Sequence, residues 1–235
     1  MRHWIGVLGL LALAGAAPSL PGVGVTDDRV TVDAAVAPWR SLARLQIPGE
    51  NRCTAVLIGP RTALTAAHCL WAWRTHRFVA AGSVHVLTGY AFGNFARHSV
   101  AVSYRLAAGN TEAQPTAPET DIAVVTLAEP IGSAPLPLAP ADPAIDTPVM
   151  LGGYNQDRGE VIEADRHCHI LGAVPDRLVH TCAGTHGTSG APLLAQAADG
   201  SWQVVGLQVA AFTEHAGGLA VPVSRLRLVL AAVAP

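Results

Sequence analysis

The sequence predicts an all-β protein, a sandwich or barrel, with two groups of strands and a single C-terminal helix. Three observations support this fold class. Short apolar runs rich in Val, Leu and Thr recur along the chain between turn residues, a pattern typical of strands. A proline-rich segment over residues 130–147 divides these runs into two groups and is expected to cross the surface as a linker. Only the last segment has apolar residues at helical spacing.

The N-terminus has the layout of a secretory signal peptide. Arg2 precedes an apolar run from Trp4 to Ala14, and small residues follow at Gly15–Ala17. The run is short for a transmembrane helix. We therefore expect residues 1–17 to be removed and residues 18–35 to form an extended arm. The mature protein is expected to be exported from a bacterial cell, secreted or periplasmic, without membrane association.

The remaining residues, 36–235, are expected to form one domain. Its first group of strands covers about residues 36–129, with segments such as CTAVLIG, and its second covers about 148–223, with WQVVGLQVAAF. A helix is predicted at about residues 224–233, with Ser224 as its N-terminal cap. Its apolar face consists of Leu226, Val229, Leu230 and Val233.

Composition excludes several classes of protein and partner. A chain of 235 residues is long enough for a sizeable core, and with 50% hydrophobic and 14% charged residues it is not a disordered chain. The formal net charge of −2 offers no electrostatic reason for binding nucleic acid or an anionic membrane. We expect neither partner, and we expect a monomer.

Four cysteines in an exported protein predict two disulfides. Four cysteines permit three connectivities, and proximity in the chain favours Cys53–Cys69 and Cys168–Cys182.

The alternative to the second disulfide is a zinc site. Its spacing matches no common zinc pattern, so we expect no metal. The ligands of that alternative site would come from His167, Cys168, His169, His180 and Cys182.

Three polar residues occupy positions suited to nucleophilic hydrolysis. His68 ends the apolar segment TALTAAH, Asp121 opens the segment DIAVVTL, and Ser189 lies in the glycine-containing loop GTSGAP. A serine needs a base to take its proton. Histidine suits this role because its ordinary pKa of about 6.5 lets it accept and return a proton. A buried carboxylate would fix the tautomer of the ring.

The segments LTAAHC, TDIAVVTL and GTSGAPLL occur in this order and resemble the signature segments of chymotrypsin-fold (trypsin-like) serine peptidases. The resemblance covers about residues 26–232. It implies two six-stranded barrels with the site between them, and a serine endopeptidase that cuts protein or peptide substrates through an acyl-enzyme without a cofactor. The implied roles are His68 as general base, Asp121 as orienting carboxylate and Ser189 as nucleophile. The backbone N–H groups of Gly187 and Ser189 would form the oxyanion hole.

Departures from the family pattern refine this expectation. Thr188 stands where the digestive enzymes have an aspartate that pairs with a new N-terminus, and the pattern is closest to the bacterial glutamyl-endopeptidase-like branch. Val209 stands where the family often has a serine that holds the orienting acid, so Asp121 needs other donors. The expected specificity pocket has no evident charged group and consists of Ala183, Thr185, His186, Gln208 and Val209.

A second class of function stays open at this point. The chain could be a non-catalytic binding protein on a protease fold. Nothing in the sequence requires this alternative, because all three residues of the triad and Gly187 are present.

Overall fold

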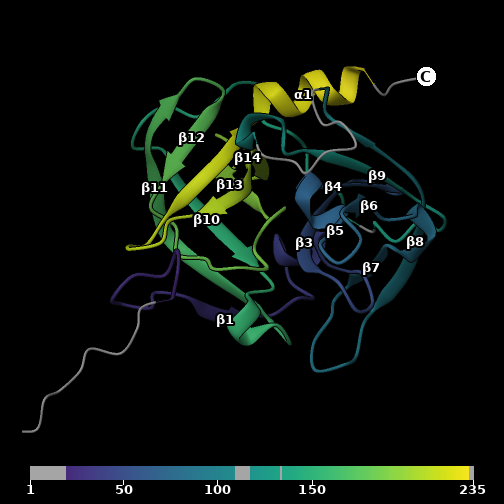
Figure 1. Cartoon of the computed structure of the whole chain (residues 1–235). Helices are drawn as coiled ribbons and strands as arrows, with labels where there is room; N and C mark the ends of the chain where they lie inside the picture. Colours follow the sequence, from purple (N-terminus) through teal and green to yellow (C-terminus); the bar gives the residue numbers. More distant parts are fainter. Residues whose placement is uncertain (1–19, 109–116, 133, 233–235) are drawn as a thin grey trace, which may run out of the picture.

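The computed structural model describes residues 20–108, 117–132 and 134–232, and Figure 1 shows their arrangement. The signal peptide expected at residues 1–17 lies outside the described residues. Within those ranges, no helix is long and apolar enough to cross a membrane.

Six antiparallel strands form the first barrel, in the hydrogen-bonded order β2-β3-β4-β9-β8-β7. Strand β3 carries the segment CTAVLIG, and five consecutive residues of it are buried because they face the barrel interior or the second barrel. The short strands β5 (Trp71–Ala72) and β6 (Arg77–Phe78) form a separate hairpin. The six barrel strands are β2 (Leu42–Gln46), β3 (Arg52–Gly59), β4 (Thr62–Thr65), β7 (His85–Thr88), β8 (Arg97–Leu106) and β9 (Ala123–Leu127).

Six further antiparallel strands form the second barrel, which closes through the pairing of β11 with β12. Figure 1 shows the two barrels beside each other, with the C-terminal helix across one end. The predicted fold class, two six-stranded barrels and a C-terminal helix, is confirmed. The strands are β10 (Pro148–Gly153), β11 (Ile162–Val174), β12 (Arg177–His180), β13 (Pro192–Gln196), β14 (Trp202–Ala211) and β15 (Gly218–Pro222).

The N-terminal arm is more than an extended segment. Its strand β1 (Val30–Val32) pairs with β11 and so adds a seventh strand to the sheet of the second barrel. Arg29 is buried next to it, in ion pairs with Asp27 at 2.9 Å and Asp157 at 2.8 Å. The arm thus belongs to the second barrel although it precedes the first in the chain.

The proline-rich segment between the barrels is only partly the surface linker that we expected. The side chains of Ile131, Leu136 and Ala139 are buried. The N–H of Ala139 donates to the carbonyl of Val204 on β14 at 2.9 Å. The segment therefore packs these apolar side chains into the protein and exposes Pro135 and Pro137 between them.

Helix α1 (Val223–Ala231) packs its apolar face, including the fully buried Leu226, against the second barrel. The expectation that Ser224 caps this helix is wrong. The carboxylate of Asp142 accepts hydrogen bonds from the backbone N–H of Ser224 at 2.8 Å and from its hydroxyl at 2.7 Å. A carboxylate at a helix N-terminus also interacts favourably with the helix dipole, so a residue distant in sequence does the capping.

Candidate active site

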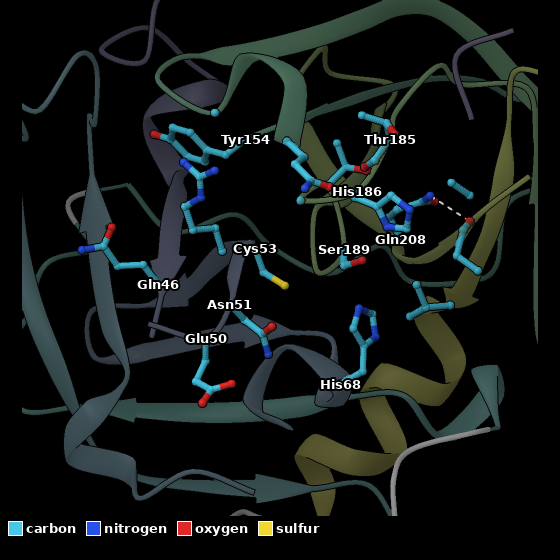
Figure 2. Close-up of a pocket in the computed structure, with 18 of the residues that line it drawn as sticks. Gln46, Glu50, Asn51, Cys53, His68, Tyr154, Thr185, His186, Ser189 and Gln208 are labelled. Atoms are coloured by element: carbon cyan, nitrogen blue, oxygen red, sulfur yellow. Dashed lines mark hydrogen bonds between the residues drawn. The ribbon is translucent and has the colours of Figure 1, made fainter. Parts of the chain in front are cut away.

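A cleft of about 920 Å³ is lined by both barrels. His68 and Asp121 reach it from the first barrel, and Ser189 and Gln208 from the second. Figure 2 shows the imidazole of His68 pointing toward Ser189, with Thr185, His186 and Gln208 gathered beside the serine. The structure therefore places His68, Asp121 and Ser189 in one cleft, although each is more than fifty positions from the next in the chain.

His68 lies on a short 3-10 helix, η2 (Ala67–Leu70), directly after strand β4. The next residue forms the disulfide Cys53–Cys69, which ties η2 to strand β3 with a Cα–Cα distance of 6.1 Å. The amide of Asn51 also donates to the carbonyl of Trp71 at 2.6 Å, just after η2. These constraints hold the backbone of His68 in place at the edge of the cleft.

Asp121 binds His68 at two points. Its Oδ2 lies 2.5 Å from His68 Nδ1, and its Oδ1 accepts the backbone N–H of His68 at 2.8 Å. Asp121 is 6% exposed and follows the 3-10 helix η4 (Pro118–Thr120). The donor that Val209 cannot supply is thus replaced by the backbone of His68 itself. Because Nδ1 donates to the carboxylate, Nε2 of the neutral ring is free to accept a proton.

Ser189 lies in the loop between β12 and β13, and the first barrel holds its backbone. The N–H of Thr54 on β3 donates to the carbonyl of Ser189 at 3.0 Å. Gly190 follows with φ +80°, and a Cβ there would lie 2.3 Å from the carbonyl oxygen of Thr54. A side chain at position 190 would therefore separate the serine from the first barrel.

Gly187 has the conformation that an oxyanion hole requires. Its φ is +92°, and a Cβ would lie 2.2 Å from the carbonyl oxygen of Tyr154. The carbonyl of His186 accepts the N–H of Gln156 at 2.6 Å, so the N–H of Gly187 points the opposite way across the planar peptide. Within the described part of the chain, the N–H groups of Gly187 and Ser189 have no protein acceptor. Both are available to a developing negative charge.

Neutral hydrogen bonds hold this loop in place of an ion pair. The hydroxyl of Thr188 donates to the carbonyl of Thr185 at 2.6 Å. The buried Asn155 accepts the N–H of Thr185 at 3.0 Å. From the first barrel, the hydroxyl of Thr54 donates to the carbonyl of Gly187 at 2.9 Å.

Sequence reasoning missed Asn155 and Thr54. Asn155 is 30 positions from Thr185, and Thr54 is 133 positions from Gly187. No local pattern marks either residue, since an Asn in a turn and a Thr in a strand are common for other reasons.

Four of the five residues predicted for the specificity pocket line the cleft, and the fifth does not. Thr185, His186, Gln208 and Val209 line the cleft. Ala183 is buried and not among the lining residues; its N–H donates to the carboxylate of Asp165 at 2.8 Å.

The N-terminal arm also reaches the cleft, where Pro21 is a lining residue. Its neighbour Gly22 accepts the N–H of Gly184 at 3.0 Å and donates to the carbonyl of Phe212 at 2.5 Å. A Cβ at Gly22 would lie 2.1 Å from the carbonyl oxygen of Gly184, so only glycine fits. The arm therefore forms part of the wall beside the pocket.

The structure contains the disulfides Cys53–Cys69 and Cys168–Cys182. The alternative zinc cluster around Cys168 and Cys182 thus has no thiolate to offer in this state. Both Sγ atoms of the other disulfide lie within 4.8 Å of a ring nitrogen of His68, but they too are bonded to each other.

Comparisons with known proteins identify the family of the chain. The profile of the family described as "Trypsin-like peptidase domain" matches residues 53–207. The solved structure titled "Structure of Glu endopeptidase in complex with MPD" is similar to this chain, with a TM-score of 0.76 and 22% sequence identity. The match covers 89% of this chain and 98% of the other. No curated protein sequence matches the chain. From the family match and the fold together, the chain belongs to the trypsin-like serine peptidases.

Proposed function

We propose that this protein hydrolyses peptide bonds through a Ser189–His68–Asp121 triad and an acyl-enzyme. The observation that carries the proposal is the two-point contact of Asp121 with His68, whose ring points toward Ser189 in Figure 2. This contact leaves Nε2 of His68 as the proton acceptor on the side of the serine.

The residues have defined roles in the first half of the reaction. Ser189 Oγ attacks the carbonyl carbon of the scissile bond while His68 Nε2 takes the hydroxyl proton. The oxygen of the carbonyl becomes negatively charged and accepts hydrogen bonds from the N–H groups of Gly187 and Ser189. His68 then gives its proton to the leaving amine, the C–N bond breaks, and an ester of Ser189 remains.

A water molecule completes the cycle. His68 takes a proton from the water as its oxygen attacks the ester carbon, and returns that proton to Ser189 Oγ as the ester bond breaks. The products are a free carboxylic acid and the unchanged serine. No step draws on a cofactor.

The proposal includes export. Two disulfides are typical of proteins that fold in an oxidising compartment. The signal-peptide pattern of residues 1–17 supports the same location, with proteins or peptides outside the cytoplasm as substrates.

Labelling with a fluorophosphonate probe tests the proposal. The wild-type protein should become labelled at Ser189, and the variant Ser189→Ala should not. Circular dichroism and a thermal melt of both proteins show whether they are folded. A folded wild-type protein that takes no label would contradict the proposal and favour a non-catalytic binding protein on this fold.

A further inference from the structure

Gln208 lines the cleft that holds Ser189, where a substrate would place the residue whose carbonyl is attacked, called P1. Gln208 lies on strand β14, and its carbonyl accepts the N–H of Gly190, directly after Ser189, at 2.8 Å. Its own N–H donates to the carbonyl of Ala191 at 2.8 Å. The backbone of Gln208 is thus hydrogen-bonded to Gly190 and Ala191, the two residues that follow Ser189. Gln208 therefore lines the cleft beside Ser189.

The orientation of the Gln208 amide is set by two independent contacts. Its Nε2 lies 2.9 Å from the carbonyl oxygen of Ala210, which can only accept, so a nitrogen must face that carbonyl. Its Oε1 lies 2.6 Å from Nε2 of His180, at the end of β12. Both contacts therefore identify the group next to Ala210 as the NH₂ of the Gln208 amide and the group next to His180 as its oxygen.

The tautomer of His180 agrees with this orientation. The N–H of Cys182 donates to Nδ1 of His180 at 3.2 Å, so Nδ1 carries a lone pair and the proton is on Nε2. His180 is completely buried, and burial lowers its pKa to about 4, which keeps the ring neutral at pH 7. A neutral ring with its proton on Nε2 donates to Gln208 Oε1 and prevents the amide from rotating.

The side chain of Gln208 carries two amide hydrogens, and the residue is 1% exposed. The first is bound to Ala210, and the second has no acceptor among the described residues. The hydroxyl of Thr185, which lines the same side of the cleft, also has no partner within the described ranges. The charged residues that line the cleft, such as Arg44 and Glu50, come from the first barrel. The lining residues of the second barrel include no arginine, lysine or carboxylate, and His186 is the one described side chain among them that can carry a positive charge.

We infer that His180 and Gln208 select substrates with a carboxamide side chain, glutamine or asparagine, at P1. This inference rests on the proposed peptidase function. The carboxamide oxygen accepts the free N–H of Gln208, and the Thr185 hydroxyl satisfies the carboxamide nitrogen or oxygen. A lysine or arginine at P1 would place its own N–H donors against the N–H donor of Gln208. A leucine at P1 would leave that N–H without an acceptor. A glutamate would lose hydration without gaining an arginine or lysine partner on the second-barrel side of the cleft.

A series of fluorogenic peptides that differ only at P1 tests the inference. For the wild-type protein at pH 7, kcat/KM for glutamine or asparagine should exceed that for leucine and lysine by ~10- to 100-fold. The ratio of glutamate to glutamine cleavage should be low at pH 7 and rise toward pH 5, as the substrate carboxyl takes up a proton. A preference for glutamate, leucine or lysine at pH 7 would overturn the inference.

Variants assign the selectivity to the two residues. Gln208→Leu should lose the preference for glutamine over leucine, while Gln203→Leu, on the same strand but outside the cleft lining, should keep it. His180→Gln keeps a donor near the position of Nε2 and should retain the preference that His180→Leu loses. An unchanged P1 profile in Gln208→Leu would overturn the assignment. Because the wild-type series alone decides the P1 class, a variant that fails to fold does not remove the test.

Fluorophosphonate labelling separates the two proposals. A wild-type protein that is labelled but cleaves all P1 residues equally contradicts only the carboxamide inference. A folded protein that takes no label contradicts the peptidase proposal and the inference with it.

Discussion

The two barrels support the proposed active site by different physical means. The first barrel contributes the hydrogen-bonded pair of His68 and Asp121, and a disulfide and Asn51 hold the turn that carries His68. The second contributes Ser189 and its loop, which neutral hydrogen bonds from Thr188, Asn155 and the first-barrel residue Thr54 hold in place.

The difference concerns activation. A loop ordered by an ion pair with a new N-terminus needs a cleavage that creates that N-terminus. A loop ordered by neutral side chains of the same chain needs no such event. Because Thr188 is buried and bonded to Thr185, the loop that carries the proposed oxyanion site is held without an ion pair at position 188.

The largest expected effect concerns the His68–Asp121 pair of the first barrel. Asp121→Asn should lower kcat by ~10⁴-fold, because an amide at this position favours the wrong tautomer of His68. Steady-state hydrolysis of a peptide substrate measures the loss. Glu119→Gln, on the preceding turn and outside the cleft lining, is the matched control and should keep its activity. Equal activity of Asp121→Asn and wild type would remove Asp121 from the proposed triad.

The next effect concerns the backbone of the second barrel. Gly187→Ala should lower kcat by ~10²- to 10³-fold, because a Cβ would collide with the carbonyl of Tyr154 and turn the N–H away from the oxyanion. Gly200→Ala is the control, since it has φ +82° but no atom within 4 Å of the added Cβ. Similar losses in both variants would mean that backbone strain, and not the oxyanion site, explains the result.

A smaller effect is expected from Asn155, one of the residues whose neutral hydrogen bonds hold the loop of Ser189. Asn155→Ala should lower kcat by ~10-fold with little change in KM, because the loop loses the acceptor for the N–H of Thr185. The rate of fluorophosphonate labelling should fall in parallel. Asn94→Ala, on an exposed turn of the first barrel, should change neither quantity. If Asn155→Ala changed stability alone, the asparagine would have no part in ordering the loop.

The last prediction concerns stability and pH. Burial lowers the pKa of His180 to about 4 in the folded protein, whereas an unfolded chain binds this proton near pH 6.5. Between these values the unfolded state takes up more protons, so His180 should cost about 3 kcal/mol of stability as the pH falls from 6.5 to 4. Urea unfolding across this range measures the slope. His180→Gln cannot titrate, and an equally steep slope in this variant would contradict the prediction.

Local chemistry explains why much of the fold was predictable. Short Val- and Leu-rich runs separated by turn residues indicate strands, and strands β3, β9 and β14 lie where those runs are. The C-terminal helix follows from apolar spacing. The docking of β1 on the second barrel was not predictable, because it depends on pairing with β11, more than a hundred positions away.

The misses share one physical cause. The cap of α1 comes from Asp142, 82 positions from Ser224, whereas the local sequence pointed to Ser224, which is the second residue of the helix. In the same way, the donor to Asp121 is a backbone N–H, which every residue except proline carries and no side-chain pattern reveals.

Local sequence was enough to identify the residues that are chemically able to act: a serine in a glycine-containing loop, a histidine beside a cysteine and an aspartate before an apolar strand. It also showed that position 208 of the expected pocket carries an uncharged glutamine. The orientation of these groups follows from the folded structure, through the two-point contact of Asp121, the direction of the Gly187 N–H and the amide of Gln208 held by His180. The reason is that a hydrogen bond depends on distance and angle, and these are set by segments that meet only when both barrels have closed.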